Sequence, residues 1–288
     1  MPKKRNIWLC IACFPLVTIA QPTDKILQKK LQALVQGFKG DCGYYVKNLQ
    51  SGKVAQYNAD SIYPTASIVK VPILIGIMDK LDKQQLSYHQ SLTYTDSLFY
   101  SGEDILGSFK NNEKISLAKV IMLMLTTSDN TASLWLQQLA GTGTRINEIL
   151  QQYGFVHSRV NSRTMGREVY KNEYGWGQTT PKEMATFFEY MYSGKIINDS
   201  ASKKMIRLLG RNYWDEEAIS QIPATVFVAS KNGAVSASRS EVLLVMAKQP
   251  YIVSIFTNNI ADKSWEPNNE AWALTRSISN CIFAYYNK

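Results

Sequence analysis

The stretch Thr65-Ala66-Ser67-Ile68-Val69-Lys70 is followed by an apolar run from Val71 to Met78. A helix that begins near Ser67 puts residues three apart on one face, so the Lys70 ammonium would lie beside the Ser67 hydroxyl. A serine becomes a nucleophile when a neighbouring group takes its proton, and a lysine in a dry pocket can do this. Four-residue matches also arise by chance, so the stretch alone fits an ordinary helix start with an exposed lysine as well.

Two further motifs follow in order along the chain. Ser128-Asp129-Asn130 comes after an apolar segment, and Lys231-Asn232-Gly233-Ala234 comes after a strand-like one, with 61 residues from Ser67 to Ser128 and 103 from Ser128 to Lys231. Three motifs in this order and at these separations resemble the active site of the penicillin-recognising serine enzymes, specifically class A β-lactamases. Without the other motifs, Ser128 and Asn130 would be read as common helix caps.

The resemblance implies a fold as well as a site. It covers nearly the whole chain after residue 20 and implies a β-lactamase/transpeptidase-like fold, α/β plus all-α, with an antiparallel sheet flanked by terminal helices and an inserted helical lobe. The pattern of the chain agrees, because sheet segments at both ends with helices between them favour a discontinuous α/β lobe. We expect residues 21–63 and 211–288 to form that lobe and residues 64–210 to form the helical lobe.

Hydrophobic spacing and turn residues predict the individual elements. The strongest helix start is Thr180-Pro181-Lys182-Glu183, with a cap residue, proline at the first helical position and glutamate at the third. The predicted helices cover residues 25–38, 67–82, 116–125, 130–139, 181–194, 199–210 and 268–286, and the predicted strands cover 43–48, 53–57, 225–229, 240–248 and 251–257.

The first 20 residues have the composition of a secretory signal. Three basic residues, Lys3 to Arg5, precede an apolar run from Ile7 to Ala20 that ends in small residues. The run is about 14 residues long, short of the roughly 20 that span a bilayer, which disfavours an uncleaved anchor. A lipoprotein attachment at Cys13, after Ile11-Ala12, is disfavoured because the apolar stretch that precedes it is too short. We expect cleavage after residue 20, a periplasmic or extracellular protein, and no transmembrane segment in the mature chain.

Charge and residue counts exclude several partners. Cleavage removes three positive and no negative charges, which lowers the formal net charge from +9 to +6. The lysines are scattered and form no basic stripe with interleaved aromatics, so we expect a basic surface that binds no nucleic acid. The chain has two histidines, His89 and His157, and no Cys/His cluster. This disfavours a zinc site and a Ser-His-Asp triad, and no metal or other cofactor is expected.

The resemblance also implies a role for each motif residue. Ser67 is the nucleophile that forms an acyl-enzyme, Lys70 is its activating partner, and Ser128 relays a proton to the departing nitrogen. Whether the lysine or a glutamate is the base of the acylation step stays open. Asn130 holds a substrate amide, whereas Asp129 stabilises its own loop through backbone hydrogen bonds. On the third motif, Lys231 attracts the substrate carboxylate and Gly233 lets substrate approach the strand, while the N–H groups of Ala234 and Ser67 form an oxyanion hole.

Asn232 and Arg239, in and near the third motif, differ from the family pattern. Asn232 stands where the family usually has a hydroxyl residue that bonds the substrate carboxylate, and its amide could replace that bond. Arg239 lies within one residue of a carboxylate-binding arginine found in some members. An ordinary edge-strand cation is the alternative for Arg239.

The mature chain keeps two cysteines, Cys42 and Cys281. The family fold makes their elements neighbours, and free thiols are slightly favoured over a disulfide.

The segment between Asn161 and Thr180 departs most from the family pattern. Class A enzymes need a glutamate that activates the deacylating water, with an asparagine four residues later, and Glu168 and Asn172 have that spacing. Counting back without gaps from Thr180, however, puts Thr164 at the glutamate's position. Gly177 or Gln178 stands where an aspartate usually pins the loop, which leaves Arg163 without its usual partner. Glu168 is therefore either the deacylation base or a surface glutamate.

Three functions remain after this comparison. The first is a monomeric class A β-lactamase, a serine hydrolase of β-lactams with a role in β-lactam catabolism and antibiotic resistance. The second is a D-Ala-D-Ala carboxypeptidase or penicillin-binding protein that deacylates slowly. The third is a non-catalytic binder of cell-wall peptides, against which the intact Ser67, Lys70, Ser128 and Lys231 argue. Glu168 separates the first two, and we expect the first.

Overall fold

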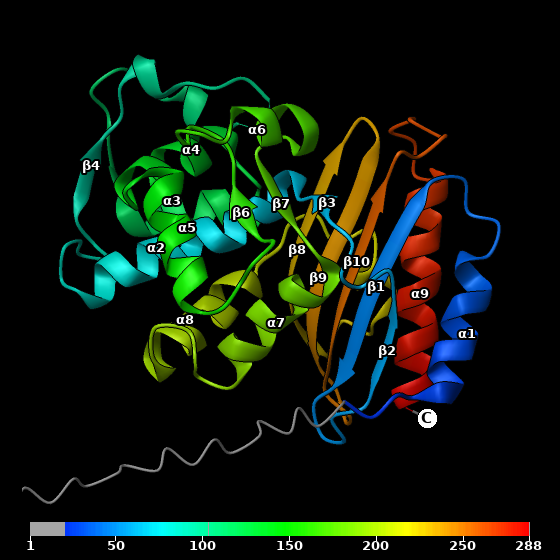
Figure 1. Ribbon diagram of the computed structural model, residues 1–288. Coiled ribbons are helices and arrows are strands. Elements are labelled where there is room, and N and C mark those ends of the chain that lie inside the picture. Colours follow the sequence, from blue (N-terminus) through cyan, green and yellow to red (C-terminus); the bar gives the residue numbers. More distant parts are fainter. Residues whose placement is uncertain (1–20, 103, 288) are drawn as a thin grey trace, which may run out of the picture.

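The computed structural model describes residues 21–102 and 104–287, so the predicted signal segment lies outside the described residues. Its centre is a five-stranded antiparallel sheet in the order β2-β1-β10-β9-β8 (Figure 1). The sheet joins the two ends of the chain, as the sequence predicts. Its strands are β1 (Asp41–Asn48), β2 (Val54–Tyr57), β8 (Phe227–Val235), β9 (Ser238–Met246) and β10 (Tyr251–Asn258).

The terminal helices α1 (Lys25–Val35) and α9 (Glu270–Tyr286) cover one face of this sheet (Figure 1). Their buried leucines and isoleucines share one core with β1, β9 and β10. The α1 helix ends three residues earlier than predicted, because the chain turns at Gly37, whose φ of 86° favours glycine. Cys42 and Cys281, on β1 and α9, are free thiols. Burial raises the pKa of the Cys42 thiol to about 12.

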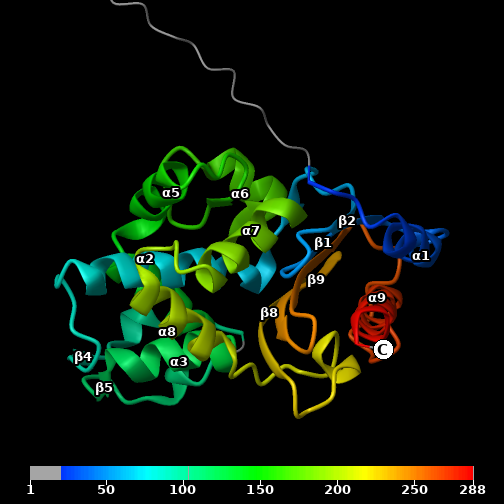
Figure 2. The ribbon, with the colours of Figure 1, turned by 90° about the horizontal axis from the view of Figure 1, so that it is seen from below.

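The remaining helices lie on the other side of the sheet (Figures 1 and 2). At their centre is α2 (Lys70–Asp82), of which the first ten residues are all buried. Among these helices, α7 packs directly against β1 and β10. The helices around α2 are α3 (Leu117–Thr126), α4 (Asn130–Leu139), α5 (Thr142–Gln152), α6 (Glu168–Tyr174), α7 (Pro181–Tyr192) and α8 (Asp199–Leu209).

The predicted helix from Ser67 is divided into two pieces. A 3₁₀ turn, η1 (Ala66–Val69), leads directly into α2 at Lys70. Pro72 is then the third residue of α2, in the first turn, where backbone N–H groups have no partner within the α-helix. The missing N–H of proline is therefore tolerated, and α2 continues unbroken to Asp82.

Several short elements were not predicted, namely α5, α6 and two small sheets. One small sheet has the order β3-β7-β6, from Tyr63–Pro64, Gly177–Thr179 and Arg159–Val160, and the other pairs β4 (Ser91–Thr93) with β5 (Lys114–Ser116). The remaining 3₁₀ turns are η2 (Asp96–Leu98), η3 (Leu106–Ser108) and η4 (Ile219–Gln221). We retain as a proposal the division of the chain at residues 64 and 211.

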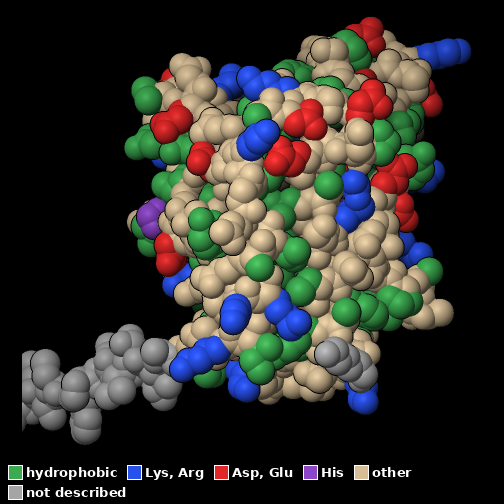
Figure 3. Space-filling view, turned by 90° about the vertical axis from the view of Figure 1, so that its right-hand side faces the viewer, with side chains coloured by type: hydrophobic (Ala, Val, Ile, Leu, Met, Phe, Trp, Pro, Cys, Tyr) green, Lys and Arg blue, Asp and Glu red, His purple; other side chains and the backbone are tan. Residues whose placement is uncertain are grey.

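On the face in Figure 3, acidic side chains lie mainly in the upper half, and the basic ones are dispersed rather than joined in one stripe. Among the helices of residues 21–102 and 104–287, none combines the length and the apolar character that crossing a bilayer requires.

Candidate active site

Ser67 and Lys70 lie on consecutive elements, the 3₁₀ turn η1 and the helix α2. Ser67 is half-buried in η1, and Lys70 is completely buried at the start of α2. The Lys70 Nζ lies 2.9 Å from the Ser67 Oγ, so the two groups that the first motif predicts to be neighbours are in hydrogen-bond contact. This distance suits transfer of a proton from the hydroxyl to an amine.

The second motif meets the same lysine. Lys70 Nζ lies 2.9 Å from Ser128 Oγ and 3.0 Å from Asn130 Oδ1, and it also contacts the Ser128 carbonyl oxygen. Ser128 has a φ of 63° and Ala66, just before the nucleophile, has a φ of 44°. Both are non-glycine residues in the left-handed region, a strained conformation that is frequent at functional sites. Ser67, Lys70, Ser128 and Asn130 thus form one cluster.

Asp129 holds two backbone segments in place. Its Oδ1 accepts a hydrogen bond from Ala132 N at 2.7 Å and caps α4, and its Oδ2 accepts from Ile105 N and Leu106 N. The predicted structural role of Asp129 is confirmed, and it extends beyond its own loop. The neighbouring Ser128 and Asn130 are fixed by the same anchoring.

The third motif lies inside β8, which extends six residues past its predicted end at 229. The strand packs against η1, and a Cβ added at Gly233 would lie only 2.6 Å from the Thr65 carbonyl oxygen and 2.9 Å from the Ser67 nitrogen. Glycine is therefore required at position 233 because the 3₁₀ turn that carries Ser67 packs closely against it. The reason predicted from the sequence was a different one, namely access for the substrate. Ser67 and Ala234 line the same cavity.

Lys231 and Asn232 contact each other. The Lys231 Nζ, which is completely buried, donates to the carbonyl oxygen of Asn232 at 2.9 Å and to its side-chain Oδ1 at 3.1 Å. The Asn232 amide is thereby oriented by the lysine, and Asn232 itself lines the cavity.

Arg239 does not take the position that the sequence interpretation gave it. Its side chain is buried, and its guanidinium donates to the carbonyl oxygens of Val235, Ser238 and Ser264. The guanidinium carbon also lies 4.2 Å from the centre of the Trp265 ring. Since these contacts engage the guanidinium and Arg239 is not among the cavity's lining residues, it serves the structure around the cavity.

The cavity that opens at Ser67 has a volume of about 340 Å³. Besides the motif residues, its lining includes a group that the sequence analysis missed. The sequence signal was the close succession of tryptophan and acidic residues at 213–217 and 262–266, both outside the predicted helices and strands. The lining residues outside the motifs are Trp214, Glu216, Glu217, Trp265, Glu266, Pro267 and Trp272.

The segment from Asn161 to Gln178 is closed by an arginine that was also missed. Arg167 donates to Asn161 Oδ1 from Nε and Nη2 and to Gln178 Oε1 at 2.7 Å, and its guanidinium stacks on Tyr170. Arg163 is exposed, as expected for an arginine without its usual partner. Aromatic packing also closes this segment, because Trp176 lies edge-on to Tyr100 with ring centres 5.0 Å apart.

Glu168 is not brought to the cluster around Lys70. It is the first residue of α6, its side chain is exposed, and its Oε1 accepts a hydrogen bond from the Gly166 nitrogen at 3.2 Å. Glu168 is also absent from the residues that line the cavity, and Asn172 is exposed on the same helix. The arrangement favours the surface alternative for Glu168 over the deacylation base.

The fold and the Ser67 cluster define a class, the superfamily of serine β-lactamases and penicillin-binding proteins. Within it, the chain belongs to the Beta-lactamase enzyme family, whose model matches residues 25–286, and its resemblance is to the class A enzymes. Beta-lactamase VEB-1 of Pseudomonas aeruginosa is 20% identical and aligned over 98% of both chains. Beta-lactamase BRO-1 of Moraxella catarrhalis is 21% identical, over 92% of this chain and 88% of the relative.

Solved structures at low identity confirm the fold. The structure of PBP-A superimposes with a TM-score of 0.82 at 22% identity, covering 92% of this chain and 97% of the other. A beta-lactamase from Chitinophaga pinensis gives a TM-score of 0.81 at 17% identity, covering 91% and 100%. The β-lactamase/transpeptidase-like fold predicted from the sequence is therefore correct.

Proposed function

We propose that the protein is a serine acyltransfer enzyme whose Ser67 is acylated by β-lactams and related peptides. One observation supports this most strongly: the Lys70 Nζ lies 2.9 Å from both Ser67 Oγ and Ser128 Oγ. A single buried lysine thus links a nucleophile to a second hydroxyl along one proton route. A non-catalytic binder of cell-wall peptides would not need this connection.

The acylation step uses the two hydroxyls and the lysine. Ser67 Oγ attacks the carbonyl carbon, a new C–O bond forms, and the amide C–N bond breaks. The hydroxyl proton passes to the Lys70 amine and from there through Ser128 Oγ to the departing nitrogen. The N–H groups of Ser67 and Ala234 stabilise the developing oxyanion, and loss of one such donor typically lowers the rate by about 10²–10³.

The fate of the acyl-enzyme separates the two catalytic candidates. The exposed position of Glu168 supports slow deacylation, as in a penicillin-binding protein or a D-Ala-D-Ala carboxypeptidase. A solved relative in this fold, a mutant of PBP-A, is an acyl-enzyme complex with penicillin G. Rapid hydrolysis by a β-lactamase is the second candidate. It is supported by the relatives VEB-1 and BRO-1, which are β-lactamases and align with this chain over 98% and 88% of their own length. For either candidate we propose action in the periplasm or outside the cell.

Incubation with a chromogenic cephalosporin, followed by intact mass, tests the proposal. We expect one equivalent of colour, a mass increase located on a peptide that contains Ser67, and little further turnover. Sustained turnover without a persistent adduct would favour the β-lactamase. An adduct that survives in Ser67→Ala would refute Ser67 as the nucleophile, and the absence of both colour and adduct would refute the acylation chemistry.

A further inference from the structure

The cavity at Ser67 has a wall that the acylation chemistry does not use. Three tryptophans and three glutamates come from the segment after α8, the loop between β10 and α9, and the start of α9. Among the described residues that line the cavity, none is a lysine or an arginine. We call Trp214, Trp265, Trp272, Glu216 and Glu266 the tryptophan–glutamate wall.

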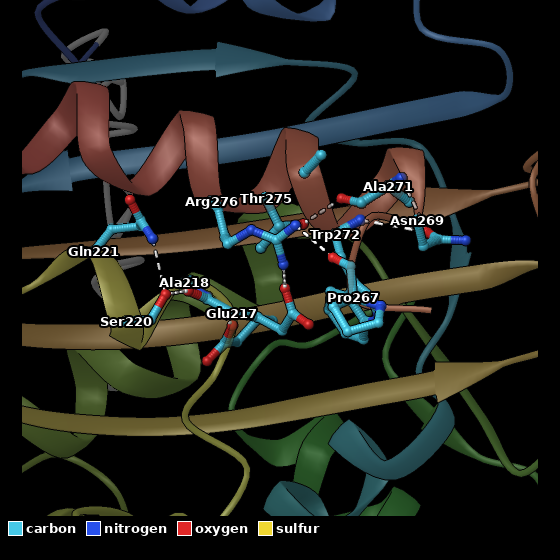
Figure 4. A network of polar contacts seen from close by, with 12 residues as sticks. Glu217, Ala218, Ser220, Gln221, Pro267, Asn269, Ala271, Trp272, Thr275 and Arg276 are labelled. Carbon is cyan, nitrogen blue, oxygen red and sulfur yellow. Dashed lines mark hydrogen bonds and ion pairs between the residues drawn. The ribbon is translucent and has the colours of Figure 1, made fainter. Parts of the chain in front are cut away.

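One of the three glutamates is neutralised by a neighbour. Glu217 forms an ion pair with the Nη1 of Arg276, whose Nη2 donates to the Pro267 carbonyl oxygen (Figure 4). This arginine contributes no surplus positive charge, because it is paired with a carboxylate that itself lines the cavity. Glu216 and Glu266 are both exposed, and no ion pair in the described chain includes either of them. These two carboxylates therefore add negative charge to the wall that no ion pair offsets, and the one guanidinium that contacts the rings of the wall in the described chain is that of Arg239.

The aromatic rings of the wall already accommodate a cation. Trp265 stacks on the buried Arg239 guanidinium at 4.2 Å, and the Trp272 ring centre lies 5.9 Å from it. Trp265 and Trp214 nevertheless remain 65% and 37% exposed, so ring surface is left for a ligand. Tryptophan binds ammonium groups through the negative face of its ring, and adjacent carboxylates strengthen that attraction.

A buried acid lies behind the same part of the cavity. Glu241 is paired across the strands with Asn232, and it is completely buried. Its Oε2 accepts a hydrogen bond from Ala218 N at 2.8 Å, whereas its Oε1 has no hydrogen-bond partner. Directly paired residues of antiparallel strands project from the same face of the sheet, so Glu241 lies on the face that presents Asn232 to the cavity.

We propose that the tryptophan–glutamate wall is a subsite for a cationic group of the substrate, a primary or quaternary ammonium. This inference deepens the proposed function and relies on it for the reacting end of the substrate. The ammonium would contact the tryptophan rings and the carboxylates of Glu216 and Glu266, while the carbonyl reacts at Ser67. The preferred substrates are then β-lactams or peptides with a positive charge at this end.

The first experiment measures cation binding without any acylation. Choline is titrated against the protein while tryptophan fluorescence is recorded, with 3,3-dimethylbutan-1-ol as the uncharged molecule of the same shape. We expect choline to bind at least about fivefold more tightly than the alcohol. The double variant Glu216→Gln/Glu266→Gln should lose this preference, and Glu113→Gln, an exposed glutamate before β5, should keep it. Equal affinity for both molecules, or an unchanged preference in the double variant, would overturn the inference.

The second experiment measures acylation of Ser67 by two cephalosporins that differ only in the C3 group, trimethylammoniomethyl in one and neopentyl in the other. The ammonium group also activates the β-lactam ring chemically, so the measured quantity is the ratio of the two acylation rates in each protein. We expect this ratio to be several-fold larger in the unmutated protein and in Glu113→Gln than in the double variant. An equal ratio in all three proteins would contradict the subsite. Choline binding without any acylation would instead leave the subsite intact and refute the proposed function.

Discussion

The Nη2 of Arg167 donates a hydrogen bond to the Oε1 of Gln178 at 2.7 Å. The same guanidinium also donates twice to the Asn161 Oδ1. An arginine from the middle of the segment and two neutral side chains at its ends thus hold residues 161–178 together. The arginine–carboxylate pair that the family resemblance implies for this segment is replaced by an arginine–amide arrangement.

Replacing Arg167 with methionine should therefore destabilise the protein by about 1–3 kcal/mol, because Asn161 and Gln178 are buried and would lose their charged donor. Unfolding in urea, followed by circular dichroism, measures the change. Arg163→Met is the matched control, since Arg163 lies in the same segment and is exposed. Equal unfolding midpoints for the two variants would show that the Arg167 contacts contribute nothing to stability.

Glu168 provides a test of the deacylation step. Because its side chain is exposed and bonded to the Gly166 nitrogen, we expect Glu168→Gln to form and lose the acyl-enzyme at the rates of the unmutated protein. Stopped-flow acylation and time-resolved intact mass measure the two rates, with Glu173→Gln on the same helix as the control. Selective accumulation of acyl-enzyme in Glu168→Gln would mean that Glu168 is the base after all.

Lys231 is expected to attract the carboxylate of the substrate. Lys231→Ala should raise KM for an anionic β-lactam about tenfold or more, since a charge-assisted hydrogen bond is worth about 1.5–3 kcal/mol. The methyl ester of the same β-lactam is the control, because it lacks the charge and should be affected far less. An equal loss for acid and ester would assign Lys231 to the structure or to the chemical step, and thermal unfolding of the variant would distinguish these two.

Much of the fold could be predicted because its signals are local. The α4 bounds were predicted correctly, since the Asn130–Leu139 run is preceded by the capping Asp129 and ends two residues before Gly141. At Thr180-Pro181, the side chain of Thr180 accepts from the Glu183 nitrogen as a helix cap should. The Glu183 carboxylate, however, accepts from the backbone nitrogens of 156–158 rather than from the cap residue. Local sequence does not specify such long-range hydrogen bonds.

The site was predictable to the extent that spacing determines it. Ser67 and Lys70 are three residues apart, and their contact follows from one helical turn. The exposed position of Glu168 follows no such local rule, and its neighbour Arg167 makes tertiary bonds to Asn161 and Gln178 at the two ends of the segment. The wall of the cavity likewise joins residues from distant segments, with Trp214 and Trp265 some 50 positions apart in the chain. Tertiary contacts of this kind leave no periodic pattern in the sequence.

Glu241 is a buried carboxyl whose ionisation should be visible in the stability of the protein. Burial is the main cause that raises its pKa to about 8, with smaller effects from the Ala218 N–H, Glu217, Lys231 and Asp215. Between the pKa of an ordinary glutamate and a pH of about 8, the folded protein keeps the proton on Glu241, while the unfolded chain releases it. The unfolded state then binds fewer protons, so this group makes stability fall as pH rises.

Glu241→Gln should remove that fall, because the amide keeps the size of the side chain and an acceptor for the Ala218 nitrogen but cannot ionise. We expect the free energy of unfolding to match the unmutated protein near pH 5 and to exceed it progressively up to pH 8, by about 1.4 kcal/mol per pH unit at most. Above pH 8 the difference should level off. Urea unfolding at half-unit steps of pH measures it, with Glu113→Gln as the exposed control that should show no such trend. A pH-independent difference between Glu241→Gln and the unmutated protein would mean that Glu241 is already ionised in the folded state near pH 5.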